Sequence, residues 1–303
     1  MLQAWALVCL GLLTSCSHAQ DTRPQSRRGG STVAALRAAI KKLEPLHQKL
    51  GRPGPRDWLS HHAERGQTFD QYLRSRAVLA RGKRDTIYIQ PLGEMDDVRR
   101  RIVDLTVEYM ALYFGCPVKV RLPLSLKVIP RSARRRHGGS EQILTTHVLD
   151  EVLKPRLPKD AAAFLAFTAT DLWPGKRWNF VFGQASLRER VGVWSIARNG
   201  DPTASEKAFR LCLLRTLKTA THETGHMFSM PHCIAFECNQ CGSNSRAESD
   251  RRPLALCPEC MAKVCWGSGK DSRERYLALA GFCKQQGLDR EQGFFARSAA
   301  ALR

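Results

Sequence analysis

Apolar residues recur at helical or strand spacing along most of the chain beyond residue 32, and they predict alternating helices and strands. The clearest helix is expected over residues 96–114, because Gly115 follows it as a stop. Its apolar face would be formed by Val98, Ile102, Leu105, Tyr109 and Leu112. Further helices are expected over residues 33–50, 56–81, 143–153 (extending to 156) and 209–227. Strands are expected over residues 86–89, 118–129 with a break at Pro123, 163–170, 178–182 and 191–197, and a basic loop over 131–139. This alternation predicts an α/β fold.

Composition and charge limit the class of protein. The chain has 303 residues, enough for one large domain or two small ones, and 43% of them are hydrophobic, as in a globular protein with a buried core. Lys and Arg number 48 against 28 Asp and Glu, a formal net charge of +20. Such an excess attracts polyanions or acidic substrates. No recognition helix, RNA-binding signature or stacking-aromatic pattern accompanies it in the sequence, so we interpret the charge as a solvated basic face and expect no specific nucleic-acid partner.

The stretch THETGHMFSMPHC carries the strongest chemical signal. His222 and His226 are four residues apart, so a helix places both imidazoles on one face, with Glu223 beside them. Pro231 ends that helix before the third histidine, His232. Three histidines hold a zinc ion and leave its fourth position open, which is typical of a catalytic rather than a structural site. The spacing therefore predicts a catalytic zinc with Glu223 as the general base.

Five of the eleven cysteines follow the third histidine closely: Cys233, Cys238, Cys241, Cys257 and Cys260. Their clustering in CxxC pairs favours a structural zinc site of four thiolates over a disulfide framework. Cys257 and Cys260 form one pair. For the second pair, spacing alone prefers Cys238 and Cys241, because two CxxC motifs separated by fifteen residues are typical of a zinc ribbon.

The histidine motif, Cys238-Asn239-Gln240 and the later CPEC together resemble the archaemetzincins, a zinc metallopeptidase family of the metzincin clan. The family pattern is HExxHxxGxxHC, then Cys-x-Met, then a late CxxC. The runs DTIYIQPLG, TATDLWP, WNFVFGQAS and VGVWSIAR extend the resemblance to about residues 80–285. Two positions depart from the pattern: Ser229 stands at the glycine between the second and third histidines, and Gln240 at the methionine of the Met-turn beneath the metal. A left-handed backbone at Ser229 would cost on the order of 1 kcal/mol, and a buried amide at Gln240 would need its own hydrogen bonds.

The resemblance implies an α/β (α+β) fold with a metzincin-like catalytic domain, in which a mixed sheet and the active-site helix are followed by a C-terminal four-cysteine zinc subdomain. It implies two zinc ions: a catalytic one on His222, His226 and His232, and a structural one on Cys233, Cys238, Cys257 and Cys260, with Cys241 left over. The implied activity is hydrolysis of peptides or small proteins, with aminopeptidase and endopeptidase action both open. An edge strand within residues 184–195 would hold the substrate backbone. The departures at Ser229 and Gln240 make a zinc-binding scaffold without turnover the alternative.

The first twenty residues, MLQAWALVCLGLLTSCSHAQ, resemble an export signal whose apolar run, residues 4–13, is too short to span a membrane well. The tetrapeptide that ends at Cys16 also resembles a bacterial lipobox. We therefore favour an exported monomer anchored to the membrane through a lipidated Cys16, with a cytoplasmic location as the alternative. The expected organisation is a leader over residues 1–19, a flexible tether over 20–32, a helical segment over 33–84, the metallopeptidase domain over 85–290 and a tail over 291–303.

Overall fold

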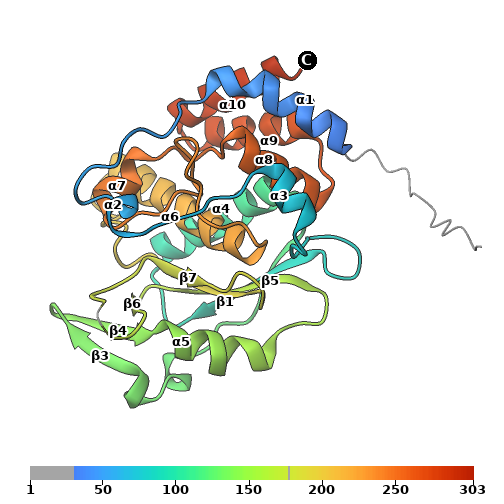
Figure 1. Ribbon diagram of the computed structural model, residues 1–303. Helices are drawn as coiled ribbons and strands as arrows, with labels where there is room; N and C mark the ends of the chain where they lie inside the picture. Colours follow the sequence, from blue (N-terminus) through green and yellow to red (C-terminus); the bar gives the residue numbers. More distant parts are fainter. Residues whose placement is uncertain (1–30, 177) are drawn as a thin grey trace, which may run out of the picture.

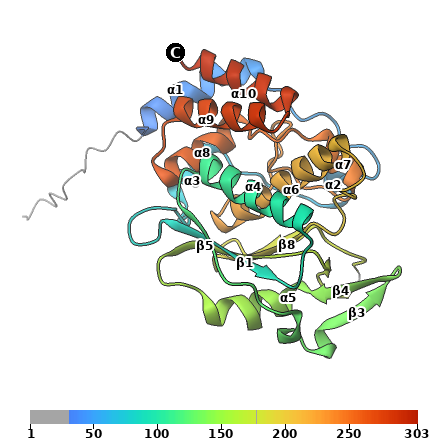
Figure 2. The same ribbon diagram turned by 180° about the vertical axis from the view of Figure 1, so that it is seen from behind.

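The computed structural model describes residues 31–176 and 178–303, so the predicted leader, Cys16 and most of the predicted tether lie outside it. The main sheet runs across the middle of the molecule (Figure 1). Helices α4 (Asp97–Phe114) and α6 (Glu206–Met227) cover one face of this sheet. The helical segment formed by α5 (Thr145–His147), η4 (Val148–Leu153) and η5 (Lys154–Arg156) covers the other. The same layers are seen from behind in Figure 2. This layered arrangement confirms the predicted α/β fold class.

The main sheet has five strands, and one of its edges lies at the site described below. Their order is β2 (Val118–Val120), β1 (Thr86–Leu92), β5 (Ala161–Thr168), β8 (Val191–Ser195) and β7 (Gly183–Ala185). Neighbouring strands run parallel except β7, which is antiparallel to β8. All residues of the central strand β5 are buried, because helices cover both faces of the sheet. Strand β7 forms an edge, and it begins within one residue of the region expected to bind substrate.

A second, three-stranded sheet contains β3 (Arg134–His137), β4 (Ser140–Leu144) and β6 (Asp171–Trp173). The basic loop expected over residues 131–139 is therefore wrong: its second half is β3. The helix expected from residue 143 begins only at Thr145, because the two residues before it belong to β4. The buried side chain of Gln142 on β4 links the three strands. It accepts a hydrogen bond from Arg135 Nε on β3 at 2.7 Å and donates one to Asp171 Oδ2 on β6 at 2.7 Å.

Capping residues determine where the two long helices, α4 and α6, begin and where α4 ends. Asp96 Oδ1 accepts from the backbone N–H of Arg99 at 2.8 Å, and Gly115 ends α4 with φ at 67°. Ser205 Oγ accepts from the N–H of Ala208 at 3.1 Å and starts α6. The helix predicted over residues 96–114 is confirmed to within one residue, and α6 extends the predicted active-site helix by three residues at its start.

The first and last helices of the described chain lie side by side. α7 (Arg246–Arg251), α8 (Pro258–Ser268), α9 (Ser272–Gln285) and α10 (Asp289–Ala301) complete the chain. α1 (Val33–Leu43) packs on α8, with Leu36 and Leu43 completely buried (Figures 1 and 2). Most of the residues expected to form a tail, 291–303, lie in α10, which packs along α9 and buries Phe295. Within residues 31–176 and 178–303, no helix has the length and apolar character needed to cross a membrane.

Two other predictions, one helix and one strand, differ from the structure in regions where the backbone bonds to distant parts of the fold. The helix expected over residues 56–81 is reduced to α2 (Trp58–His61) and α3 (Phe69–Arg74). Between them Gly66 has φ at 62°, and the N–H of Trp58 is bonded to the distant carboxylate of Glu248. The strand expected over residues 178–182 is a single bridge between Val181 and Leu172, and β7 begins after it.

Candidate active site and metal centres

Helix α6 and the turn that follows it bring the three predicted histidines together. His222 and His226 lie one turn apart, with their Nε2 atoms 3.0 Å from each other. The ring centre of His232 lies 5.3 Å from that of His222 and 4.8 Å from that of His226. One nitrogen of each ring lies within 4.8 Å of the other two. Zinc–nitrogen bonds of about 2.0–2.1 Å place the ligand atoms about 3.3 Å apart around a tetrahedral ion, so this donor set fits zinc.

The second nitrogen of each ring is bonded to an acceptor. His222 Nδ1 lies 2.8 Å from the carbonyl oxygen of Asn239, and His226 Nδ1 lies 2.8 Å from a carbonyl in the turn after α6. His232 Nδ1 lies 2.7 Å from Glu64 Oε1. Since carbonyl and carboxylate oxygens only accept, each Nδ1 carries the hydrogen and each Nε2 keeps a lone pair for a metal. Burial, and after it the nearby His232, lower the pKa of His222 to about 3, which favours the neutral ring that a metal requires.

Glu223 lines the same cavity and is 7% exposed. Burial raises its pKa to about 8, a shift that the charge of a bound dication would oppose. Gly183 of β7 lies directly against it: a methyl group on Gly183 would stand 2.6 Å from Glu223 Cγ and 2.7 Å from Oε1. A glycine is therefore required there, because only a backbone without a side chain can approach this carboxylate so closely.

The two residues that depart from the family pattern are both accommodated. Ser229 has φ at 61°, so it does adopt the expected left-handed conformation. Its hydroxyl donates to the carbonyl of Leu187 at 2.9 Å and accepts from the N–H of Val78 at 3.1 Å. Gln240 is 1% exposed and lies against Gly225 of α6, and its amide nitrogen is 3.4 Å from two backbone carbonyls of the site. The Ser229 hydroxyl and the Gln240 amide nitrogen thus both have hydrogen-bond partners within the fold.

A cavity of about 450 Å³ extends over Glu223 and the histidines. Strand β7 borders it together with the aromatic residues Trp58, Trp178, Phe180 and Phe182. Polar residues border it as well: Lys218, Asn239, Asn244 and Arg252. Lys218 is 5% exposed and donates to the carbonyl of Arg252 at 2.6 Å, and desolvation lowers its pKa to about 8. The lining of the cavity is therefore partly apolar and partly polar.

Four buried cysteines lie together, with their sulfur atoms within 4.8 Å of one another: Cys233, Cys238, Cys257 and Cys260. The sulfurs of Cys233 and Cys257 are 3.7 Å apart. Two thiolates 2.3 Å from a tetrahedral zinc would be about 3.8 Å apart, whereas a disulfide needs about 2.05 Å. Backbone N–H groups of Gln240 and Cys257 approach the sulfur of Cys238 at 3.4 and 3.2 Å. The geometry fits a structural zinc on this set, and Cys241 lies outside it, with its thiol 3.3 Å from a backbone carbonyl.

Glu64 and Gly183 are among the residues of the site that sequence reasoning missed. Glu64 precedes its partner His232 by 168 positions, so nothing local to either residue signals the contact. Burial opposes the ionisation of Glu64, but hydrogen bonds to His232 and Trp58 outweigh it and lower its pKa. Gly183 could have been suspected only from the WNFVFGQAS run, in which it is one ordinary glycine.

Two histidines on a helix, a third beyond its end and a glutamate inside the pair define the class: a zinc metallopeptidase. The family model for Peptidase family M54 matches residues 161–265. Archaemetzincin-2 of Rattus norvegicus is 36% identical over 280 residues, which cover 80% of this chain and 77% of that protein. Archaemetzincin-2 of Homo sapiens is 34% identical and covers 84% of this chain and 79% of its own length. The chain therefore belongs to the archaemetzincin family of zinc metallopeptidases, as the resemblance predicts.

Solved structures of archaeal archaemetzincins align with part of the chain. The protein from Archaeoglobus fulgidus, complexed with malonate, is 30% identical and covers 59% of this chain and 99% of its own, with a TM-score of 0.46. The protein from Methanopyrus kandleri is 29% identical and covers 61% of this chain and 96% of its own, with a TM-score of 0.48.

Proposed function

We propose that this archaemetzincin hydrolyses peptide bonds in the cavity over α6, with zinc held by His222, His226 and His232. The observation that carries the proposal is the meeting of three histidine rings, a buried carboxylate and an edge strand in one cavity. When bound, zinc supplies a Lewis acid that polarises water and the scissile carbonyl group. The remaining chemistry belongs to the side chains of this chain.

Glu223 is the residue that moves protons in this proposal. The three histidines hold the metal through their Nε2 atoms, which leaves the carboxylate, on the same turn of α6, free for another task. As general base it accepts a proton from the attacking water, and as general acid it delivers that proton to the leaving amine. Because Gly183 covers the carboxylate, β7 holds it in place while excluding bulk water from that side.

Strand β7 is the surface on which we place the substrate backbone. It pairs with β8 on one side and forms the edge of the sheet on the other. An extended peptide can add to such an edge through main-chain hydrogen bonds. Gly183 lies against Glu223, so a peptide paired with β7 would cross the carboxylate. The aromatic residues of the cavity would receive its apolar side chains.

The four-cysteine cluster supports a second, structural zinc ion. Its thiols are buried, free of disulfides and spaced for tetrahedral binding. Cys233 directly follows His232, so an ion at the cysteines fixes the backbone that presents the third histidine. The structural site thereby stabilises the geometry of the catalytic one.

A scaffold without turnover is the second candidate, and the substitutions at Ser229 and Gln240 are the reason to consider it. Against it, both residues are bonded within the fold, and neither removes a predicted ligand or the base.

The test compares wild type with Glu223→Gln, which keeps the size of the side chain beneath Gly183. We expect hydrolysis of a peptide library to fall about 10²–10⁴-fold while zinc content, measured by elemental analysis, stays unchanged. Glu206→Gln, on the same helix but with a side chain 80% exposed, is the control and should behave as wild type. Retained turnover in Glu223→Gln would show that Glu223 is not the base. A wild type that binds zinc but cleaves no peptide would establish the scaffold instead.

A further inference from the structure

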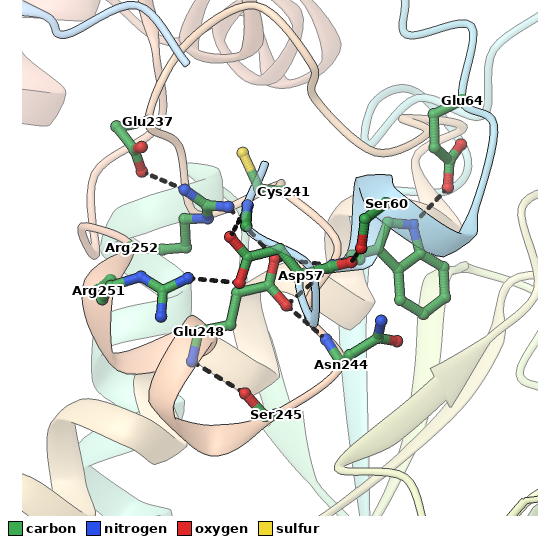
Figure 3. Close-up of polar contacts among 12 residues, drawn as sticks. Asp57, Ser60, Glu64, Glu237, Cys241, Asn244, Ser245, Glu248, Arg251 and Arg252 are labelled. Atoms are coloured by element: carbon green, nitrogen blue, oxygen red, sulfur yellow. Dashed lines mark hydrogen bonds and ion pairs between the residues drawn. The ribbon is translucent and has the colours of Figure 1, made fainter. Parts of the chain in front are cut away.

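An irregular segment from the amino-terminal half, residues 54–64, crosses the loop between the cysteine pairs and ends at the histidine site. We call this segment the strap. It contains α2, and Trp58 and Glu64 lie on it. Figure 3 shows Asp57 of the strap beside Glu248 and Arg251 of the later loop, with Glu64 farther along the strap. The strap and the loop are therefore a single polar assembly built from distant parts of the sequence.

Glu248 holds the middle of the strap. Its carboxylate is 1% exposed and accepts from the backbone N–H of Trp58 at 3.0 and 3.1 Å, one distance to each oxygen. It also accepts from the N–H of Asn244 at 2.8 Å and from Arg252 Nη2 at 3.3 Å (Figure 3). Asp57 adds a surface ion pair with Arg251 at 2.6 Å. Because Glu248 is buried and fully bonded, the strap has a fixed position on the loop.

The end of the strap touches a predicted metal ligand. Glu64 Oε1 accepts from His232 Nδ1 at 2.7 Å and from Trp58 Nε1 at 2.9 Å. The ring of Trp58 also meets that of His232 edge to face, with centres 5.0 Å apart. Glu248 thus holds the backbone of Trp58, and the indole of Trp58 orients the carboxylate of Glu64. That carboxylate in turn orients the ring of His232.

The geometry points to Glu64 as a positioning residue for the catalytic metal, supplied by a segment that lies 97 residues before the part matched by the family model. This inference rests on the proposed function, because it requires His232 to be a zinc ligand. A carboxylate that accepts from Nδ1 fixes the ring orientation, directs the Nε2 lone pair at the metal and strengthens it as a donor. His222 and His226 have neutral backbone carbonyls in that place, so Glu64 gives the third histidine the charged partner of the set.

His232 needs such support more than the other two histidines do. His222 and His226 are held by a regular helix, whereas His232 lies beyond the helix end, in an irregular stretch after Ser229. Its ring is fixed by Glu64 and Trp58 on one side, and the backbone N–H of the neighbouring Cys233 donates to the carbonyl of Gln240 at 2.9 Å. The strap therefore completes a site that the peptidase region alone would leave less ordered.

The experiment measures metal affinity at the histidine site in the full chain. Cobalt(II) is added first, because its spectrum separates a three-nitrogen site from a four-thiolate site, and zinc affinity then follows from competition with a chromophoric chelator. We expect Glu64→Ala to weaken zinc binding at the histidines about 10–100-fold and to leave the four-thiolate band unchanged. Glu64→Gln should recover part of that loss, because an amide oxygen can still accept from His232. At saturating zinc, kcat should fall in Glu64→Ala while KM is kept.

Asp57→Ala is the matched control. Asp57 also lies on the strap, and its side chain is 18% exposed against 21% for Glu64, but it bonds Arg251 and not a histidine. We expect it to lower thermal stability and to leave zinc affinity at wild-type level. Glu64→Ala that binds zinc as tightly as wild type, or Asp57→Ala that weakens it equally, would overturn the inference. A wild type that binds no metal at the histidines would instead overturn the proposed function.

Discussion

Ser229 offers a test of how a left-handed residue beside the metal site is stabilised. Glycine at this position would remove backbone strain of about 1 kcal/mol but would also lose both hydrogen bonds of the hydroxyl, worth about 1 kcal/mol each. Alanine would lose the same two bonds and keep the strain. We therefore expect Ser229→Ala to lower the free energy of unfolding by about 2 kcal/mol and Ser229→Gly by about 1 kcal/mol. The structure thus argues that restoring the family glycine destabilises this chain, because Val78 and Leu187 have become partners of the serine.

The assay is denaturant unfolding of the three proteins at one fixed zinc concentration, since bound metal shifts apparent stability. The difference between Ser and Ala measures the hydroxyl, and the difference between Gly and Ala measures the strain. If Ser229→Ala proves as stable as wild type, the hydroxyl contributes nothing and the reasoning is wrong. If Ser229→Gly proves more stable than wild type, strain outweighs the two bonds and the family residue is the better one.

Four other substitutions test the two metal sites. Gly183→Ala should lower kcat about 10²-fold with zinc retained, because the new methyl group displaces Glu223. An unchanged kcat in a peptide assay would contradict the close approach of β7 to Glu223. Gln240→Met should leave the melting temperature equal or higher, since the contacts of the amide nitrogen are long, at 3.3–3.4 Å; a clear loss would show that they matter. Cys233→Ser should lose about one zinc per chain by elemental analysis and Cys241→Ser none, and the reverse result would favour the ribbon pairing.

Much of the fold could be predicted wherever the signal is local. The helix of residues 97–114 carries both of its caps in the sequence, Asp96 before it and Gly115 after it. The active-site helix is long, periodic and ended by a turn that the histidine spacing requires. Such elements are specified by neighbours three or four residues apart.

The rest depends on contacts that only the folded chain creates. The β3–β4 hairpin shows no alternation of apolar and polar residues in the sequence. It is stabilised instead by side-chain hydrogen bonds of Arg135 and Gln142. In the site, spacing predicted the three histidines and the pair Cys257 and Cys260, whereas Cys233 followed from the family resemblance and not from spacing. The structure brings Cys233 together with Cys238, Cys257 and Cys260. Glu64 could not be predicted, because its role depends on a carboxylate meeting a ring that lies 168 residues away.

The position of the strap has a consequence for how the protein assembles during synthesis. Trp58 leaves the ribosome long before Glu248, which lies 190 positions later, yet the strap docks through the bond between them. Contacts with such separations form late, because a large loop must close before they contribute any stability. Through most of translation, the segment that carries Glu64 therefore has no docking partner. The backbone of Trp58 can be anchored by Glu248 only after residue 248 has been made, so a nascent chain that stops earlier lacks the contact that fixes the strap beside the cavity.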